Sequence, residues 1–306
     1  MMLAYWRRIR VENELIYLFL RHPVAQVAAL VALISILGAL FAPLIAPTDP
    51  YDLASFDLLD SFLPPAWEDG GDPRFLIGTD DQGRDLLSAI LYGTRLSLIV
   101  GLCSVLFAAV LGTSLGIAAG YMGGRFDAIV MRIADVQLSL PAILTALLVD
   151  GVARGILPRE SHEDLLLVVL TVAIGLSLWV DFARTARAST FVERNKEYVQ
   201  AAQIMGIHPV RIMAVAILPN VLGPLMVIGT VDLAVAILLE ATLSFLGVGV
   251  PPNQPSLGTL IDIGTGYLFS GEWWIVIFPS AMLILLIVSV NILGDFFRTV
   301  LNPRLR

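Results

Sequence analysis

Three long stretches of the sequence contain no charged residue, and they limit the possible folds more than any other feature. They are residues 24–46, 96–124 and 273–294. Hydrocarbon about 30 Å thick is crossed by roughly 20 apolar residues in a helix that rises about 1.5 Å per residue. Each stretch is long enough for such a crossing, so we predict three transmembrane helices.

Two further apolar stretches contain charged residues but are also predicted to cross. Residues 165–180 continue through Phe182, and residues 220 to about 245 include Asp232 and Glu240. The whole chain has 57% hydrophobic and only 15% charged residues, whereas soluble proteins carry about a quarter charged residues. This composition excludes an ordinary soluble fold and favours the two extra crossings.

The third crossing in chain order is the least regular. Residues 136–149 are uncharged but short, so they cross only if their helix begins near Ile129 and keeps Arg132 and Asp135 close to one membrane surface. The alternative is a re-entrant or interfacial segment. We favour a crossing, which gives an all-α, polytopic membrane protein with about six transmembrane helices. Asp135 is expected to pair with Arg132, three residues before it on the same helix.

Arginine and lysine residues set the expected orientation, because cytoplasmic loops of membrane proteins carry an excess of them. With six crossings both termini lie on one side. That side holds fourteen of the 19 basic residues, the other five being Arg74, Arg84, Arg95, Arg154 and Arg159. We therefore expect both termini in the cytoplasm of a multi-pass inner (plasma) membrane protein. The acidic residues crowd the loop after the first crossing, so the net charge of −7 gives no support for a nucleic-acid partner.

These predictions divide the chain into four parts. Residues 1–23 are charged and amphipathic and form a cytoplasmic N-terminal segment on the membrane surface. Residues 24–46 form the first transmembrane helix, and residues 47–94 form a long external loop. Residues 95–306 form a five-helix core with an ordered cytoplasmic connector at about 194–218.

Several kinds of chemistry have no motif in this sequence. A phosphate-binding P-loop ends in Gly-Lys followed by Ser or Thr, because the lysine reaches the terminal phosphates. The only lysine, Lys196, follows Asn195, so this chain lacks that motif. The single cysteine, Cys103, excludes an intrachain disulfide, and the three histidines fall in different loops. We expect no catalytic residue, no metal site and no cofactor bound by this chain.

The connector between the fourth and fifth crossings is the most informative segment outside the membrane. Tyr198, Ala201, Ala202 and Met205 recur at three- and four-residue spacing, which predicts one face of a helix. Gly206 follows, where a residue that accepts a positive φ commonly ends a helix. The alanines would allow a partner to approach the helix backbone closely.

Two prolines extend this pattern. Pro209 stands at a tolerated first-turn position and begins a second helix, and Pro219 is expected to end or kink that helix. The product is a rigid helix–turn–helix segment. One interpretation is that a groove on a soluble partner grips the first helix; the other is a solvated amphipathic connector without a partner.

The order of these residues resembles the EAA signature of ABC importer permeases. It is carried by residues 200–202 (Gln-Ala-Ala), Gly206 and residues 218–219 (Leu-Pro). In that family the signature forms the coupling helix that docks on the cytoplasmic ATPase. This sequence departs from the pattern at Gln200, where Glu is typical, and at Ala216, where Ile is frequent, which weakens the expectation of a salt bridge from position 200.

Three more segments, residues 76–98, 127–144 and 238–261, are similar to the dipeptide/oligopeptide/nickel branch of these permeases. One crossing followed by a long external loop resembles the C-type subunit of that branch. The resemblance implies a type I ABC importer permease fold that forms half of a heterodimer with a B-type permease. It also implies one or two ABC ATPases that hold ATP and Mg, an external or periplasmic solute-binding protein, and peptides or a related small solute as cargo. The ATPase-coupling residues it implies are Glu197, Tyr198, Gln200, Ala201, Ala202, Met205, Gly206 and Pro219.

Two carboxylates within the fifth crossing, Asp232 and Glu240, are candidates for the translocation path. A carboxylate within a membrane costs a few kcal/mol and usually faces a cavity or a partner. They lie eight residues apart, about 12 Å along a helix and on nearly the same face. Both could attract a cationic part of the solute, or Glu240 could hydrogen-bond loop backbone such as the turn at residues 251–252. A rival function is a proton-coupled secondary transporter that relays protons through Asp135, Asp232 and Glu240.

A dense polar turn precedes the second crossing. It contains Asp80, Arg84 and Asp85, which could bind peptide termini. We favour a turn that caps the helix and contacts the solute-binding protein, with Asp85 as an acidic residue at the helix N-terminus.

Gly112, Gly116 and Gly120 form a small-residue ridge within the second crossing. Such ridges allow helices to approach closely in lipid. We therefore predict that another helix, from this subunit or its partner, packs on this ridge.

Overall fold

The computed structural model describes residues 17–52, 57–156, 159–250 and 254–301. The predicted surface segment at residues 1–23 lies mostly outside this part of the chain. The regular elements in the described residues are helical, as predicted. They are α2 (Pro23–Leu40), α3 (Ala42–Ile45), η1 (Leu58–Asp60), α4 (Leu86–Met122), α5 (Gly124–Leu138), α6 (Ala142–Ile156), α7 (Arg159–Glu193), α8 (Glu197–Ile204), α9 (Pro209–Arg211), the π-helix η2 (Ile212–Ile217), α10 (Leu218–Phe245), α11 (Leu257–Tyr267), η3 (Leu268–Ser270) and α12 (Trp274–Leu301).

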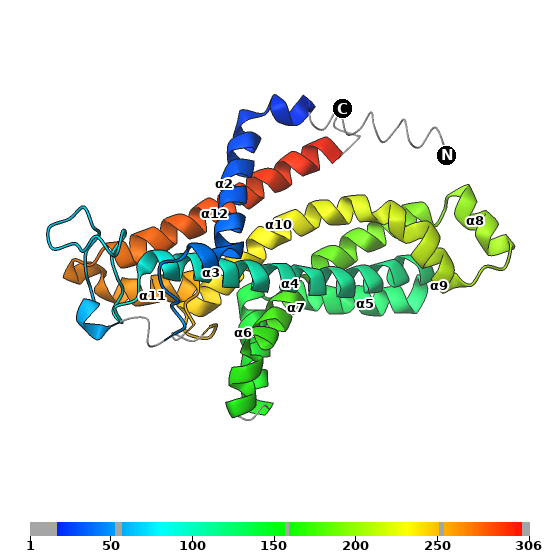
Figure 1. Cartoon of the computed structure of the whole chain (residues 1–306). Helices are drawn as coiled ribbons and strands as arrows, with labels where there is room; N and C mark the ends of the chain where they lie inside the picture. Colours follow the sequence, from blue (N-terminus) through cyan, green and yellow to red (C-terminus); the bar gives the residue numbers. More distant parts are fainter. Residues whose placement is uncertain (1–16, 53–56, 157–158, 251–253, 302–306) are drawn as a thin grey trace.

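Five of these helices are long and apolar enough to cross a membrane: α2, α4, α7, α10 and α12. The pair α5 and α6 makes a sixth crossing if the two count as one span. Figure 1 shows α4, α7, α10 and α12 running side by side, with α8 at one end and the long loop of residues 46–85 at the other. We refer to these as the α8 end and the loop end of the bundle.

The predicted third crossing is broken rather than continuous. Helices α5 and α6 meet at an angle of 99°, so the expectation of one straight helix from near Ile129 through Val149 is wrong. Pro141 follows the C-cap region of α5 and precedes α6. Proline cannot donate a backbone hydrogen bond and disfavours a helical conformation in the residue before it, which accounts for the break.

Helix α4 begins earlier than predicted. Its N-cap is Asp85, whose carboxylate accepts a hydrogen bond from the amide of Ser88 at 2.8 Å. The helix therefore starts at Leu86, so residues 86–94 of the predicted external loop are helical. A side-chain cap that satisfies the free amides of the first turn extends the helix beyond the apolar run.

The glycine ridge of α4 packs against α7 of the same chain. A Cβ atom at Gly112 would overlap the carbonyl oxygen of Trp179, and one at Gly116 would overlap that of Ala183. The prediction of close helix packing at this ridge is confirmed. Helices α4 and α7 thus approach each other closely along this ridge.

Helix α5 is joined to α7 by ion pairs. Arg187 forms a bidentate pair with Asp127, and Arg184 lies 2.5 Å from Asp135. The predicted pair between Asp135 and Arg132 is therefore wrong, because a residue on a different helix occupies the position beside the carboxylate.

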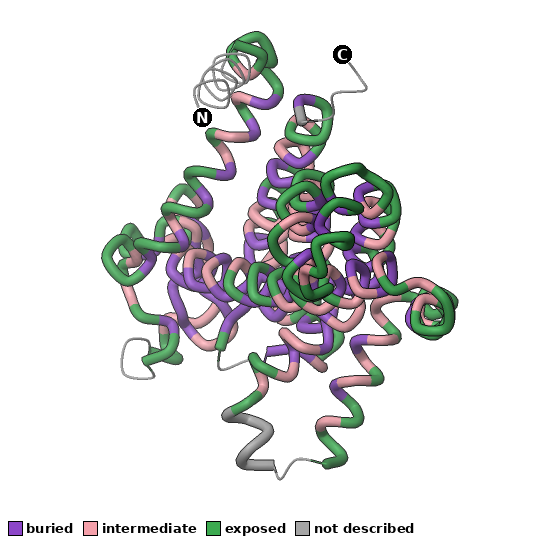
Figure 2. The backbone as a smooth tube through the Cα atoms, turned by 90° about the vertical axis from the view of Figure 1, so that its right-hand side faces the viewer, coloured by how far each residue is buried: buried purple, intermediate pink, exposed green. Residues whose placement is uncertain are grey.

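The core lies between α4, α7 and α10, where side chains such as Phe182, Ile174 and Ile217 are almost fully buried. Figure 2 shows that buried residues gather along the middle of the bundle, whereas the outer turns are exposed. Helix α2 crosses α12 and α4 on the outside of this core, and α6 projects from it (Figure 1).

Candidate functional site

The segment at the α8 end confirms the predicted helix and turn. Helix α8 ends before Gly206, which has a φ of +72°, and Pro209 starts α9. The next six residues form η2, and α10 follows without interruption. Of the two predicted outcomes at Pro219, the end of a helix is not found, and the helix is instead distorted just before the proline. Its missing amide interrupts the α-helical hydrogen bonds, and the chain takes the wider π pattern just before it.

The faces of α8 differ from the predicted ones. Val199 and Ala202 point into the bundle and are 0% and 8% exposed, whereas Ile204 and Met205 are 88% and 70% exposed. Ala202 is therefore not available to a partner, because α8 packs on η2 through this side. Sequence reasoning missed Ile204 because helical spacing does not show which side the bundle covers.

A group of polar contacts fixes the base of α8. The hydroxyl of Tyr198 donates to Glu193 at the end of α7, and Asn220 of α10 donates to Tyr198 at 3.2 Å. Lys196 lies 2.5 Å from the same glutamate. Burial, followed by the hydrogen bond to Glu193, raises the pKa of Tyr198 to about 12, so the hydroxyl keeps its proton at neutral pH. Helix α8 is thereby bonded to both α7 and α10.

Contacts with α4 complete this attachment. The side chain of Gln203 donates to the hydroxyl of Tyr121 at 3.3 Å. Arg194 donates to the carbonyl oxygens of Gly120 and Tyr121 at 3.2 and 2.9 Å, which caps the end of α4. Gln200, by contrast, bonds the nearby carbonyl of Asn195 at 3.2 Å. A force on α8 therefore reaches three of the long helices directly.

A cavity of about 1,020 Å³ opens beside this attachment. It lies between α7 and α10, with one residue from α12. Its lining residues are Asp181, Arg184, Thr185, Ser189, Val192, Glu193, Lys196, Gly223, Pro224, Val227, Ile228, Val231, Asp232 and Arg298. The cavity is a candidate for part of a solute path, since it extends from the α8 end into the bundle.

Asp232 lines this cavity, as the translocation hypothesis requires. The residue is 5% exposed, and its Oδ2 atom has no hydrogen-bond partner among the described residues. Asp181 of α7 lines the same cavity and was not selected from the sequence. It stands directly after an apolar run. A charged residue at that position can lie either at the membrane surface or in a cavity, and the sequence alone does not distinguish the two.

Glu240 lies elsewhere and is fully buried. Its carboxyl group accepts hydrogen bonds from Ser97 of α4 and from Ser244, the latter at 2.9 Å. The same Ser244 hydroxyl accepts from the amide of Val250 at 3.2 Å. The expected loop contact is thus made through a serine, while residues 251–252 lie outside the described part of the chain. Glu240 does not line the cavity.

The polar turn at residues 80–85 has buried side chains at Asp80, Arg84 and Asp85. Asp80 and Arg84 form a pair with 2.6 Å between carboxylate and Nε, and the two side chains are 0% and 1% exposed. Asp85 is also buried and caps α4, as predicted. These three side chains hold the loop and do not form its surface, so the prediction that they contact a solute-binding protein needs correction.

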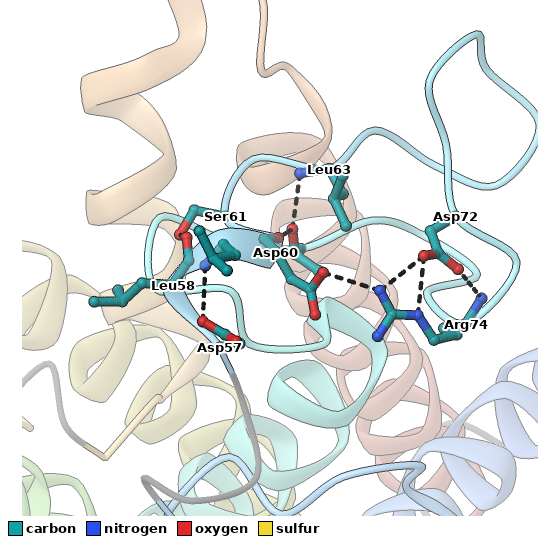
Figure 3. A network of polar contacts seen from close by, with 9 residues as sticks. Asp57, Leu58, Asp60, Ser61, Leu63, Asp72 and Arg74 are labelled. Atoms are coloured by element: carbon teal, nitrogen blue, oxygen red, sulfur yellow. Dashed lines mark hydrogen bonds and ion pairs between the residues drawn. The ribbon is translucent and has the colours of Figure 1, made fainter.

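The surface of the long loop carries its own network, shown in Figure 3. Arg74 lies 2.9 Å from Asp60 and 2.8 Å from Asp72. Hydrogen bonds from Arg74 lower the pKa of Asp72. The hydroxyl of Thr79 connects this network to the buried turn by donating to the carbonyl of Asp60 at 2.6 Å. Residues 57–85 of the loop are therefore bonded to one another from the surface down to the start of α4.

Comparison with known families identifies the class of protein. The profile described as "binding-protein-dependent transport system inner membrane component" matches residues 112–306. This chain belongs to that family. A second profile, described as the N-terminal transmembrane domain of oligopeptide transport permease C, matches residues 14–65, which assigns the chain to the C-type permease subunits. It is a multi-pass inner membrane protein of this family.

Individual relatives agree with the assignment. The chain is 39% identical to the dipeptide transport system permease protein DppC of Haemophilus influenzae, over 90% of this chain and 88% of that one. It is 38% identical to the di/tripeptide transport system permease protein DppC of Pseudomonas aeruginosa, over 90% and 86%. These relatives are named as permeases, not as ATPases.

A solved structure shows the shared fold. The inward-facing MetNI methionine ABC transporter matches with a TM-score of 0.53 and 20% identity, over 69% of this chain and 96% of that chain. The predicted type I importer permease fold is therefore confirmed.

Proposed function

We propose that this chain is one permease subunit of an ATP-driven importer of short peptides, with both termini in the cytoplasm. The observation that carries the proposal is the attachment of α8. The helix exposes Ile204 and Met205 outward, while Tyr198 bonds it to α7 and α10 and Gln203 bonds it to α4. An exposed apolar helix face can bind in a groove of a soluble partner. Because α8 is bonded to long helices, a movement of that partner would be transmitted to them.

The family assignment and the sequence support a set of proposed partners. A B-type permease completes the translocation pathway, and one or two ABC ATPases bind ATP and Mg and grip α8. A periplasmic binding protein delivers the solute at the loop end. This chain is not an enzyme in this proposal, because its only lysine is not in a P-loop. Peptides are the proposed cargo because the relatives are named as dipeptide and di/tripeptide permeases.

The mechanism is a change of access driven through α8. Closure of the ATPases moves α8, and its bonds to α7 and α10 transmit the movement to the walls of the cavity. Asp232 lies in the solute path in this proposal, whereas Glu240 has a structural role. A secondary transporter would instead act alone, and the comparisons give that alternative no support.

The test replaces Gly206 by valine in the reconstituted importer. Valine is strained at positive φ, so the turn after α8 changes and Ile204 no longer meets its groove. We expect loss of ATPase co-purification and at least a tenfold fall in ATP-dependent peptide uptake. Gly247→Val is the matched control, since Gly247 has the same φ of +72° and equally open space around it but lies at the opposite end of α10.

A second variant, Ile204→Glu, tests the same surface without strain. It places a charge on a side chain that is 88% exposed, so folding is unaffected while docking is weakened. If both variants keep their ATPase and transport normally, the proposal is wrong. Uptake driven by a pH gradient in vesicles that contain only this chain would also overturn it.

A further inference from the structure

The cavity between α7 and α10 is not uniformly charged along its length. Helices α7 and α10 are successive crossings joined through α8 and η2, so they run in opposite directions. Lys196 and Pro224 line the cavity near the α8 end, and Asp181 and Asp232 line it deeper in the bundle. At about 1.5 Å per residue, Asp232 lies roughly 12 Å beyond Pro224. The deep end of the cavity is therefore acidic.

Two of the three basic residues that line the cavity have carboxylate partners, and the third, Arg298, is exposed near the end of α12. Arg184 pairs with Asp135 at 2.5 Å, and Lys196 pairs with Glu193 at 2.5 Å. The Oδ2 atom of Asp232 is buried and receives no hydrogen bond from the described residues. A buried carboxylate oxygen without a donor is costly, so a ligand donor that reached Asp232 from the cavity would stabilise it.

We propose that Asp232 and Asp181 together bind the protonated amino terminus of the transported peptide. This inference rests on the proposed peptide importer and specifies its solute contact. An ammonium group has three N–H donors, and its hydrogen bonds to carboxylates are stronger than those between neutral groups. The neighbouring wall is formed by Val227, Ile228 and Val231, which offers apolar contact to peptide side chains of different shapes.

A metal ion fits this site less well than an ammonium group. Divalent cations such as Mg²⁺ and Ca²⁺ take about six or more oxygen ligands. No group of three or more His, Cys, Asp or Glu residues in the described residues could hold a metal ion. Two carboxylates on facing helices offer several acceptor oxygens for the three N–H donors of an ammonium group.

The experiment measures equilibrium binding of a labelled dipeptide, alanyl-phenylalanine, to the purified permease–ATPase complex without its binding protein. Omission of the binding protein removes its own selectivity from the result. We expect the wild type to bind alanyl-phenylalanine at least tenfold more tightly than N-acetyl-alanyl-phenylalanine. Asp232→Asn should weaken binding of the free dipeptide about tenfold or more while leaving the acetylated form unchanged. Asp181→Asn should also weaken binding of the free dipeptide, but by a smaller factor than Asp232→Asn.

Asp262→Asn is the matched control, because it removes one negative charge from an exposed position on α11. It should bind both dipeptides as the wild type does. Equal affinity of the wild type for the free and acetylated dipeptides would overturn the inference, as would unchanged affinity in both cavity variants. The melting temperature of each variant shows that it is folded. Loss of ATP-dependent uptake in the wild type would instead contradict the proposed function, which is a separate result.

Discussion

Asp232 and Glu240 are both buried carboxylates on α10, eight residues apart, yet their surroundings differ completely. Glu240 accepts hydrogen bonds from Ser97 and Ser244 and joins α10 to α4. Asp232 has an oxygen without a partner in the described residues and lines a cavity. Burial alone therefore does not distinguish a structural carboxylate from a functional one. The number of hydrogen-bond donors that reach the carboxylate distinguishes them.

The physical reason is the cost of an unsatisfied polar group. A carboxyl group with donors in place stabilises the packing around it, whereas one without donors destabilises the fold. A position that keeps such a group therefore points to a use other than stability. Three stability measurements can break or sharpen this comparison.

The largest effect is expected for Glu240→Ala. The change removes two buried hydrogen bonds, leaves two serine hydroxyls without their acceptor and opens a small cavity. We expect a loss on the order of 3 kcal/mol, measured as a fall of several degrees in the melting temperature of the purified complex. Asp232→Ala is the control and should change the melting temperature little. Equal losses in the two variants would show that both carboxylates are structural.

A smaller effect is expected for Ser97→Ala. This change deletes only one of the serine donors to Glu240, so we expect a loss of about 1–2 kcal/mol. Ser114→Ala is the matched control on the same helix, because the Ser114 hydroxyl is exposed and bonds only the carbonyl of Val110 in its own helix. Combining Ser97→Ala with Glu240→Gln should give less than the sum of the two single losses. Additive losses would mean that the two residues do not act as a pair.

The smallest effect is expected for Asp85, outside the membrane. One of its carboxylate oxygens accepts hydrogen bonds, as in Glu240, and the other has no donor within the described part of the chain, as in Asp232. The Oδ2 of Asp85 accepts from the amide and hydroxyl of Ser88, but its Oδ1 has no partner in the described residues. Burial raises the pKa of Asp85 above 3.8, although the hydrogen bonds from Ser88 oppose the shift. The folded protein thus holds this proton more tightly than the unfolded chain does.

The sign of the pH dependence follows from this raised pKa. The contribution of Asp85 to stability is fully present below its ordinary pKa of 3.8 and is lost as pH rises through the raised value. Asp85→Asn cannot ionise, and its side-chain oxygen can still cap α4. We expect the wild type to lose less than about 1 kcal/mol relative to this variant between about pH 4 and 7, measured from paired melting curves. A difference that grows in the opposite direction would contradict the assignment.

The sequence predicted the parts of the fold that depend on local physics. The crossings of α2, α4 and α12 follow from apolar length, and the positive φ at Gly206 follows from its place after a helix. The partner of Asp135 could not be predicted, because Arg184 is 49 residues away and only packing brings it near. The same limit applies to the site. Spacing selected both Asp232 and Glu240 and offered a structural alternative for Glu240, but the serine donors of Glu240 and the cavity beside Asp232 come from packing.

The π-helix between α9 and α10 has a geometric consequence for everything after it. A π turn holds one residue more than an α turn, and each residue of an α-helix advances the azimuth by about 100°. The six residues of η2 therefore set the rotational phase of α10 about its own axis. Deleting one of them would restore an α turn and swing Asp232 roughly a quarter of a circle away from α7, without altering a single cavity residue.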